Sequence, residues 1–227
     1  MTEQDRQKAA AAAAAVADVR PGMVVGLGTG STAAFMIDLL AERVRAGLSI
    51  LAIPTSERSA AQARRTGIPL TDFATHPEID VTIDGADQVE LGTLNLIKGM
   101  GGALLREKIV ADCSKRLLIM VDATKLADRL ALPVPVEVVR FGWEATAHKI
   151  ARLGGKAALR RDAAGATYAT DGNNAILDCD FGPIADPASL ERALREIVGV
   201  VETGLFIGRA SAVLVAGPEG VRRLERT

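Results

Sequence analysis

Lys98 and Glu107 bracket the glycine-rich stretch IKGMGGALLREK, and together they could move a proton on a small substrate. Glycines let the backbone approach a ligand closely. Two leucines precede Glu107 in that stretch, and burial of its carboxylate would raise the pKa towards that of a useful base. A nearby lysine would stabilise a developing oxyanion. Taken alone, the triplet REK is also typical of a solvated helix face.

The stretch IDGADQ forms an acidic turn after an apolar run, with Asp84 and Asp87 on either side of Gly85 and Ala86. Ligands of an open parallel sheet bind beyond the carboxyl ends of its strands, where two carboxylates suit sugar hydroxyls or proton shuttling between oxygens. Aspartates also stabilise turns, which is the structural alternative. Lys125, in VDATK, follows another apolar run and predicts either a point charge for a phosphate or an ordinary surface lysine.

A third turn, VVGLGTGSTAAF, joins an apolar run to a helical pattern. It lacks the third glycine of a dinucleotide fingerprint, because Ser31 stands there, and it lacks the P-loop lysine after Gly30. Free backbone N–H groups, the hydroxyls of Thr29, Ser31 and Thr32, and a helix N-terminus would suit a compact phosphate monoester. A tight strand-to-helix connection with capping hydroxyls explains the same residues equally well.

Apolar runs alternate with helical patterns through the first half of the chain, which predicts a parallel sheet covered by helices. The expected strands are 23–27, 49–56, 68–73, 79–87 and 116–126, and the expected helices are 3–19, 31–47, 57–67 and a fourth after the glycine loop. Ser31 or Thr32 is expected near the cap of the second helix.

The pattern changes after LALPVPV to the order β-α-β-β-α-β, which is typical of a ferredoxin-like unit. Within it, Asp186 is expected to cap a helix that begins with Pro187. SAVLVAG then returns to the first sheet. The sequence therefore predicts an α/β fold: a Rossmann-like parallel-sheet main domain (1–130 and 207–227) and a smaller ferredoxin-like α+β domain (131–206) inserted near the C-terminus.

The formal net charge of −1, from 27 basic and 28 acidic residues, gives no sign of a nucleic-acid or membrane partner. Short basic clusters, such as Arg160–Arg161 and the terminal VRRLER, are interpreted as solvated faces. The N-terminal alanine run follows acidic residues and predicts a helix rather than a signal peptide. Two cysteines without metal-binding spacing fit a reducing compartment, and a cytoplasmic location is expected.

Several of these blocks together resemble type A ribose-5-phosphate isomerase: GLGTGSTAAF, IDGAD, IKGMGGALLREKI, VDATK and GVVETGLF occur in order over nearly the whole chain. The resemblance implies interconversion of ribose 5-phosphate and ribulose 5-phosphate, a step of the non-oxidative pentose phosphate pathway, without metal or organic cofactor. It implies that Glu107 moves a proton between C1 and C2 and that Lys98 stabilises the enediolate. Asp84 and Asp87 would bind hydroxyls and assist ring opening or proton movement on oxygen.

The same resemblance implies a phosphate site at residues 29–32, helped by Lys125 and, as an open question, by Lys8. The implied substrate-binding residues are Thr29, Gly30, Ser31, Thr32, Asp84, Gly85, Ala86, Asp87, Lys98, Gly99, Met100, Gly101 and Lys125. Met100 interrupts the family's run of glycines and would narrow the pocket. The family also implies a homo-oligomer, a dimer or a tetramer.

Other functions remain possible at this point. A sugar-phosphate-sensing regulatory domain would share the architecture and the phosphate turn without catalysis, although such domains accompany a DNA-binding helix-turn-helix and no basic segment supplies one. Sugar-phosphate deaminases and coenzyme A transferases are the enzyme alternatives, and a transferase would use a glutamate as nucleophile. The Lys98–Glu107 spacing together with DGAD favours the isomerase.

Overall fold

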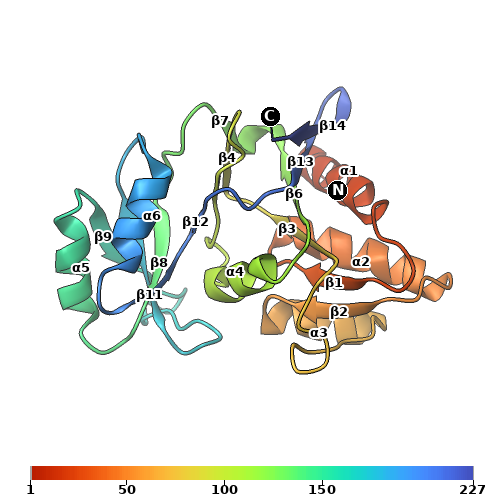
Figure 1. The fold of residues 1–227 in the computed structure, drawn as a ribbon, viewed down its shortest axis with the longest axis horizontal. Helices are drawn as coiled ribbons and strands as arrows, with labels where there is room; N and C mark the ends of the chain where they lie inside the picture. The colour runs from red at the N-terminus through yellow and green to blue at the C-terminus, as the bar shows by residue number, and fades with distance from the viewer. Residues whose placement is uncertain (1, 227) are drawn as a thin grey trace.

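A six-stranded sheet in the order β14-β13-β6-β3-β1-β2 forms the centre of the main domain in the computed structural model, which describes residues 2–226 (Figure 1). Its strands are β1 (Val24–Leu27), β2 (Leu51–Pro54), β3 (Val81–Gly85), β6 (Leu117–Asp122), β13 (Ala212–Gly217) and β14 (Gly220–Glu225). All neighbours pair in parallel except β13 and β14, which form an antiparallel hairpin. The Rossmann-like prediction is thus confirmed.

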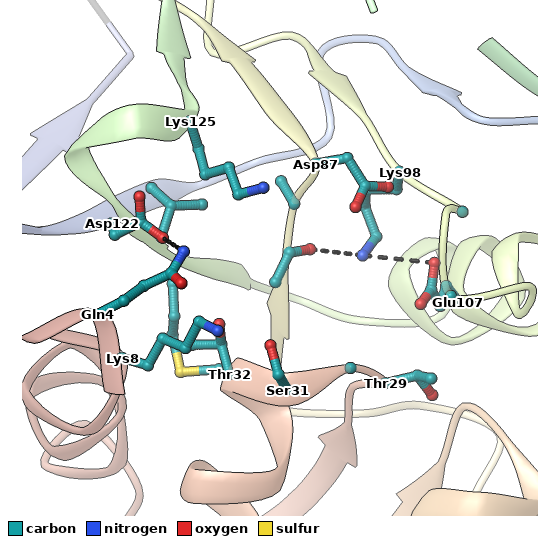
Figure 2. Close-up of a pocket in the computed structure, with 17 residues that line it drawn as sticks. Gln4, Lys8, Thr29, Ser31, Thr32, Asp87, Lys98, Glu107, Asp122 and Lys125 are labelled. Carbon is teal, nitrogen blue, oxygen red and sulfur yellow. Dashed lines mark hydrogen bonds and ion pairs between the residues drawn. The ribbon is translucent and has the colours of Figure 1, made fainter. Parts of the chain in front are cut away.

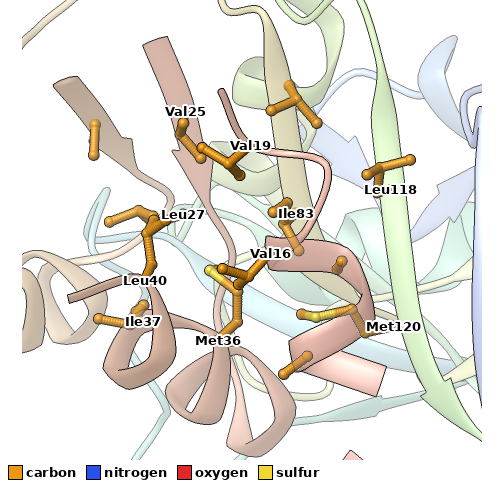
Figure 3. Close-up of a cluster of buried hydrophobic side chains, with 14 of the residues drawn as sticks. Val16, Val19, Val25, Leu27, Met36, Ile37, Leu40, Ile83, Leu118 and Met120 are labelled. Carbon is orange, nitrogen blue, oxygen red and sulfur yellow. The ribbon is translucent and has the colours of Figure 1, made fainter. Parts of the chain in front are cut away.

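Both faces of this sheet are buried, as the alternation within β6 demonstrates. Leu118 and Met120 join the cluster made with α1 (Glu3–Val16) and α2 (Ser31–Arg45), whereas Ile119 joins a second cluster on the opposite side. Figure 3 shows the first cluster, where Met36, Ile37 and Leu40 of α2 meet the strands. The small alanines of α1 are buried in the same cluster, so the N-terminal run forms a packed helix.

Two further helices complete the main domain, α3 (Glu57–Thr66) and α4 (Leu104–Asp112). Helix α3 begins after Ser56, whose side chain accepts a hydrogen bond from Ser59 N, and ends at Gly67 with φ of 84°. That left-handed conformation favours glycine. Within the described chain, every helix is too short or too polar to traverse a lipid bilayer.

The inserted domain has a four-stranded antiparallel sheet in the order β11-β8-β10-β9, which is the ferredoxin-like arrangement. Its elements are β8 (Val134–Val138), α5 (Trp143–Ala151), β9 (Lys156–Leu159), β10 (Ala175–Asp180), α6 (Pro187–Arg195) and β11 (Val200–Thr203). Asp186 caps α6 by accepting from Ser189 N at 3.0 Å. A cluster of its own, centred on Val136, Ile150 and Leu177, forms the core.

A third, small sheet joins the two units and was not predicted. It has the order β12-β5-β4-β7, from β4 (Gln88–Glu90), β5 (Leu96–Ile97), β7 (Leu126–Ala127) and β12 (Leu205–Phe206). Strands of two or three residues are too short to show a period. Strand β12 pairs with β5, so this small sheet contains residues from both sides of the insertion. The domain boundaries at 130/131 and 206/207 stay predictions.

One local expectation was wrong. The strand expected at 68–73 is only an isolated bridge between Leu70 and Ala52. The terminal VRRLER belongs to β14, a mostly exposed strand at the edge of the sheet. Its charged side chains are solvated as expected, but the backbone pairs with β13. Charge on an edge strand discourages further pairing, which masks the strand pattern in the sequence.

Candidate active site

Asp84 lies at the carboxyl end of β3 and contacts the glycine turn, the acidic turn and the side chain of Lys98. Its Oδ1 atom accepts hydrogen bonds from Thr29 N at 3.0 Å and from Gly85 N at 2.7 Å. The glycine turn must approach this carboxylate closely, because a Cβ at Gly28 would stand 2.2 Å from Asp84 Oδ1 and 2.6 Å from its Cα. Gly28 is therefore required by packing against Asp84, independently of any phosphate.

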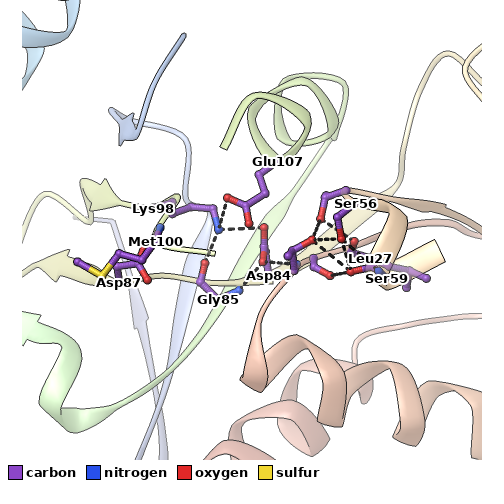
Figure 4. A network of polar contacts seen from close by, with 12 residues as sticks. Leu27, Ser56, Ser59, Asp84, Gly85, Asp87, Lys98, Met100 and Glu107 are labelled. Atoms are coloured by element: carbon purple, nitrogen blue, oxygen red, sulfur yellow. Dashed lines mark hydrogen bonds and ion pairs between the residues drawn. The ribbon is translucent and has the colours of Figure 1, made fainter. Parts of the chain in front are cut away.

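Lys98 points from the end of β5 into the same place. Its Nζ atom lies 2.9 Å from Asp84 Oδ2 and donates to Gly85 O at 2.5 Å (Figure 4). The lysine is buried, and burial alone would lower its pKa. The negative charges of Asp84 and Glu107 outweigh burial and raise the pKa of Lys98 above its ordinary value. Lys98 is therefore a charged group at a buried position.

Glu107 lies on the first turns of α4 and completes the cluster, with only 3% of its surface exposed. Its Oε2 atom stands 3.4 Å from Lys98 Nζ, yet it accepts no hydrogen bond within the described chain. Burial raises the pKa of Glu107 to about 8; Lys98 opposes that rise, and the charges of Asp84 and Asp87 add to it. A carboxylate with a free lone pair and a near-neutral pKa can act as a base.

Asp87 holds the glycine loop that follows Lys98. Its Oδ2 atom accepts from Met100 N at 2.9 Å, and Gly102 N donates to Gly99 O at 3.0 Å to close a turn. This leaves the other carboxylate oxygen of Asp87 without a partner within residues 2–226. Asp87 lines the cleft, so that oxygen is available to a ligand.

Arg160 of the inserted domain reaches across to this loop, which the sequence did not predict. Its guanidinium donates to Gly99 O at 2.9 Å and to Met100 O at 3.2 Å, and it forms an ion pair with Asp178 of β10. The side chain is only 13% exposed. The interpretation of Arg160 as a solvated residue was therefore wrong. In the sequence Arg160 is marked only by the neighbouring Arg161, and no local pattern predicts that it contacts Gly99.

The opposite end of the cleft is built by α2, α1 and the short 3₁₀ turn η1 (Ala123–Lys125). Gly30 is the N-cap of α2, with φ of 122° and no side-chain cap, and Ser31 and Thr32 are the first two residues of the helix, near the cap as expected. The first N–H groups of α2 thus lack a side-chain acceptor and favour an anion. Figure 2 shows Lys8 and Lys125 on two sides of this end, near Ser31 and Thr32.

These side chains surround a cleft of about 130 Å³. The predicted residues that line it are Thr29, Gly30, Ser31, Thr32, Gly85, Ala86, Asp87, Lys98, Gly99, Gly101, Glu107 and Lys125, joined by Lys8. Gln4 and Asp122 also line it and were not predicted; Gln4 Nε2 donates to Asp122 Oδ2 at 3.4 Å. Their signal was weak, because a glutamine in an N-terminal helix has no motif.

Three predicted residues lie differently from the rest. Asp84 does not line the cleft but stands behind Lys98. The Met100 side chain is 45% exposed and outside the cleft, so it does not narrow it. The Thr29 hydroxyl lies 2.7 Å from the hydroxyls of both Thr55 and Ser56, so its hydrogen bonds stabilise the glycine turn.

The two ends offer different chemistry. One presents helix N–H groups, hydroxyls and two lysines, which suit a phosphate. The other presents a carboxylate base beside a fixed ammonium, which suits proton transfer next to a carbonyl. Among residues 2–226, no group of three His, Cys, Asp or Glu side chains is arranged to hold a metal ion.

Comparison with known proteins gives one consistent result. The family model described as ribose 5-phosphate isomerase A (phosphoriboisomerase A) matches residues 51–220. Ribose-5-phosphate isomerase A from Gloeobacter violaceus is 59% identical over 222 residues, which is 97% of this chain and 96% of the relative. The protein of the same description from a Synechococcus strain is 54% identical and covers 100% of both chains.

Solved structures agree over the full length. Ribose 5-phosphate isomerase A from Methanocaldococcus jannaschii superposes with a TM-score of 0.95 at 38% identity, covering 99% of this chain and 100% of that one. A D-ribose-5-phosphate isomerase in complex with phospho-erythronic acid also gives a TM-score of 0.95, at 39% identity and with the same coverage.

Proposed function

The chain belongs to the ribose 5-phosphate isomerase A family and interconverts D-ribose 5-phosphate and D-ribulose 5-phosphate, and we propose that Glu107 is the base that moves the proton between C1 and C2. The observation that carries this proposal is the Oε2 atom of Glu107, which is buried and accepts no hydrogen bond within the described chain. Burial also raises its pKa, so the carboxylate is more basic than an ordinary glutamate.

The proposed reaction begins with the open-chain aldose in the cleft. Glu107 takes the proton from C2, and the electron pair of that C–H bond forms the C1–C2 double bond while the carbonyl pair moves onto O1. Protonated Glu107 then delivers a proton to C1, and the O2 hydroxyl proton passes to O1, which leaves a ketone at C2. One carboxylate on one face of the sugar performs both carbon steps.

Lys98 is the proposed stabiliser of the enediolate oxygens. Its ammonium is already held by Asp84 Oδ2 and Gly85 O, so no reorganisation is needed when negative charge develops. We assign Asp84 to holding Lys98, because both of its oxygens are engaged. Asp87, with one oxygen open to the cleft, is the better placed carboxylate to bind a sugar hydroxyl and to assist ring opening or the transfer between O1 and O2.

The phosphate is proposed to bind at the N-terminus of α2. Gly30, Ser31 and Thr32 present backbone and hydroxyl donors there, and Lys8 and Lys125 supply positive charge. This places the phosphate at the far end of the cleft from Lys98 and Glu107 (Figure 2). An open-chain pentose 5-phosphate carries its phosphate and its reacting carbons at opposite ends, so the two match.

Solvent exchange tests the proton-transfer role of Glu107. Protein treated with a chelator is incubated with ribose 5-phosphate in deuterium oxide, and deuterium at C2 of the recovered aldose is measured. The parent is expected to convert the sugar and to incorporate deuterium, because protonated Glu107 exchanges with solvent during some turnovers. Glu107→Gln should do neither, whereas Glu42→Gln, at an exposed position of α2, should match the parent. Full exchange by Glu107→Gln would contradict the proposal.

The same variant separates catalysis from binding. Phospho-erythronic acid, bound by the relative at 39% identity, carries a phosphate and a carboxylate that resembles the charge of an enediolate. We propose that it binds this cleft and that Glu107→Gln still binds it. A non-catalytic sensor would also bind the ligand but would exchange no deuterium in the parent, and the family assignment does not favour that reading.

We also propose that the protein acts in the cytoplasm as a homo-oligomer, a dimer or a tetramer. The support for the compartment is the pair of free cysteines: Cys179 is buried and Cys113 lies apart from it, as in proteins kept reduced. The support for assembly is family membership. Light scattering on the purified protein measures the mass, and a monomeric mass of 23.7 kDa at working concentration would contradict assembly.

A further inference from the structure

Lys108, the residue after the proposed base, carries a buried charge that the reaction does not use. Its Nζ atom donates to Glu191 Oε1 at 3.1 Å, to Glu202 Oε1 at 3.0 Å and to Leu205 O at 2.7 Å. The side chain is 4% exposed. Burial lowers the pKa of Lys108, and the carboxylates of Glu202 and Glu191 oppose that fall. All three partners lie beyond α4, on α6 and in the segment 202–206.

The segment 202–206 also contacts Lys98, the charged partner of Glu107 in the proposed reaction centre. Lys98 N donates to Gly204 O at 2.9 Å, and Leu205 pairs with Ile97, the residue before Lys98. The approach is close enough to require glycine, because a Cβ at Gly204 would lie 2.2 Å from Lys98 O. One short segment therefore fixes the backbone of Lys98 directly and the helix of Glu107 through Lys108.

Phe206 packs between the two lysines. Its ring centroid lies 5.4 Å from Lys98 Nζ and 4.9 Å from Lys108 Nζ, distances at which an ammonium is attracted to an aromatic face. The ring is fully buried, so it also limits how far either ammonium can move. Lys98 and Lys108 are thus fixed relative to each other by the same side chain.

We propose that Lys108 is a positioning residue that sets the separation between Lys98 and Glu107 by tying α4 to the segment 202–206. The inference rests on the proposed role of Glu107. Glu107 Oε2 and Lys98 Nζ lie 3.4 Å apart on two different elements. Both elements are joined to the segment 202–206, one through Lys98 N with Gly204 O and the other through Lys108 Nζ with Leu205 O. A base displaced by about 1 Å loses about 100-fold in rate.

The first test replaces the ammonium with an apolar chain of similar length, Lys108→Met, in the full protein. The expected result is a kcat about 10- to 100-fold below that of the parent, with a KM for ribose 5-phosphate and an inhibition constant for inorganic phosphate within about twofold. The phosphate end of the cleft does not contact Lys108 and should be unaffected. Lys115→Met is the matched control, because Lys115 pairs with Asp80 on the exposed surface.

Lys108→Met leaves Glu191 without its cation and Glu202 with only Arg195 at 3.9 Å, and this alone could unfold the protein. The triple variant Lys108→Met, Glu191→Gln, Glu202→Gln removes the buried charges together while still lacking the tie to Leu205 O. Its kcat is expected to stay low, with parent values for KM and phosphate inhibition. A kcat within twofold of the parent would overturn the inference, and so would a loss of phosphate binding in parallel with kcat. If Glu107→Gln is fully active, the proposed function fails instead.

Discussion

Lys98 Nζ and Glu107 Oε2 stand 3.4 Å apart, close enough for electrostatic attraction but without a hydrogen bond to occupy the carboxylate oxygen. Asp84 and Gly85 O already satisfy the ammonium at 2.9 and 2.5 Å. Glu107 can therefore turn its lone pair to a C–H bond without first breaking a hydrogen bond. The substrate's oxygens would meet a cation that is already in position.

Replacing Glu107 by glutamine removes the base and keeps the shape of the side chain. We expect Glu107→Gln to lower kcat by about 10²- to 10⁴-fold, the usual contribution of general base catalysis, with little change in KM. Steady-state assays with ribose 5-phosphate measure both constants. Glu42→Gln serves as the control, and comparable losses in the two variants would refute a specific role for Glu107.

The same substitution should alter stability in a pH-dependent way. The folded pKa of Glu107 lies near 8 and its unfolded value near 4.5, so the folded protein binds more protons between these values. Parental stability therefore falls as pH rises through this window, with a limiting slope of about 1.4 kcal/mol per pH unit from this group. Glu107→Gln removes that loss. Urea unfolding at pH 5 and pH 8 should show its advantage growing with pH, and an advantage independent of pH would contradict the burial argument.

Asp87 is one of the charges that raise the pKa of Glu107. Asp87→Asn keeps an oxygen that can accept from Met100 N but removes the negative charge. We expect the acid limb of kcat/KM against pH to move to lower pH, because the ionised form of Glu107 becomes easier to reach. Profiles from pH 5 to 9 measure the shift. A shift of the acid limb to higher pH would contradict the role of Asp87 in raising the pKa of Glu107.

Lys125 is expected to bind substrate and transition state equally. Lys125→Met should raise KM for ribose 5-phosphate by about 10-fold or more, the value of a charged hydrogen bond, and leave kcat nearly unchanged. Inorganic phosphate should inhibit this variant correspondingly less. Lys149→Met, on the exposed face of α5, is the control. A lower kcat at constant KM would place Lys125 in the chemistry instead.

Gly28 is required by its distance to Asp84, not by an unusual backbone angle. Gly28→Ala would place a Cβ 2.2 Å from Asp84 Oδ1, against a carboxylate that is fixed on both oxygens. We expect a loss of about 1–3 kcal/mol in unfolding free energy, together with most of the activity. At Gly217 the nearest atom to a new Cβ is 3.9 Å away, so Gly217→Ala is the matched control in thermal and urea unfolding.

The reaction end could be predicted from sequence because its residues occur in short blocks. Asp84 lies near the end of β3, Lys98 follows β5 and Glu107 lies on the first turns of α4. A parallel sheet brings the ends of its strands together. The phosphate end was predicted less completely. Lys8 was an open question and Gln4 was missed, because their helix carries no motif and reaches the cleft through packing against α2, β6 and β13.

The contributions of the inserted domain could not be predicted. Arg160 and Lys108 contact residues that are distant in the sequence. Arg160 contacts Met100, 60 positions away, and Lys108 contacts Glu202, 94 positions away. Local sequence patterns predict neither that such long-range contacts form nor which residues form them. The third sheet was missed for the related reason that β5 and β12 have two residues each.

Through Arg160, the inserted domain contacts the glycine loop at one end of the cleft, whereas the other end is built by the main domain alone. Gly30, Ser31 and Thr32 lie at the start of α2 in the main domain, whereas the loop beside Lys98 is held both by Asp87 and by Arg160 of the inserted domain. Changes within the inserted domain are therefore expected to alter turnover while the proposed phosphate site keeps its structure. This arrangement gives evolution or design a route from an enzyme to a phosphate receptor without rebuilding the sheet.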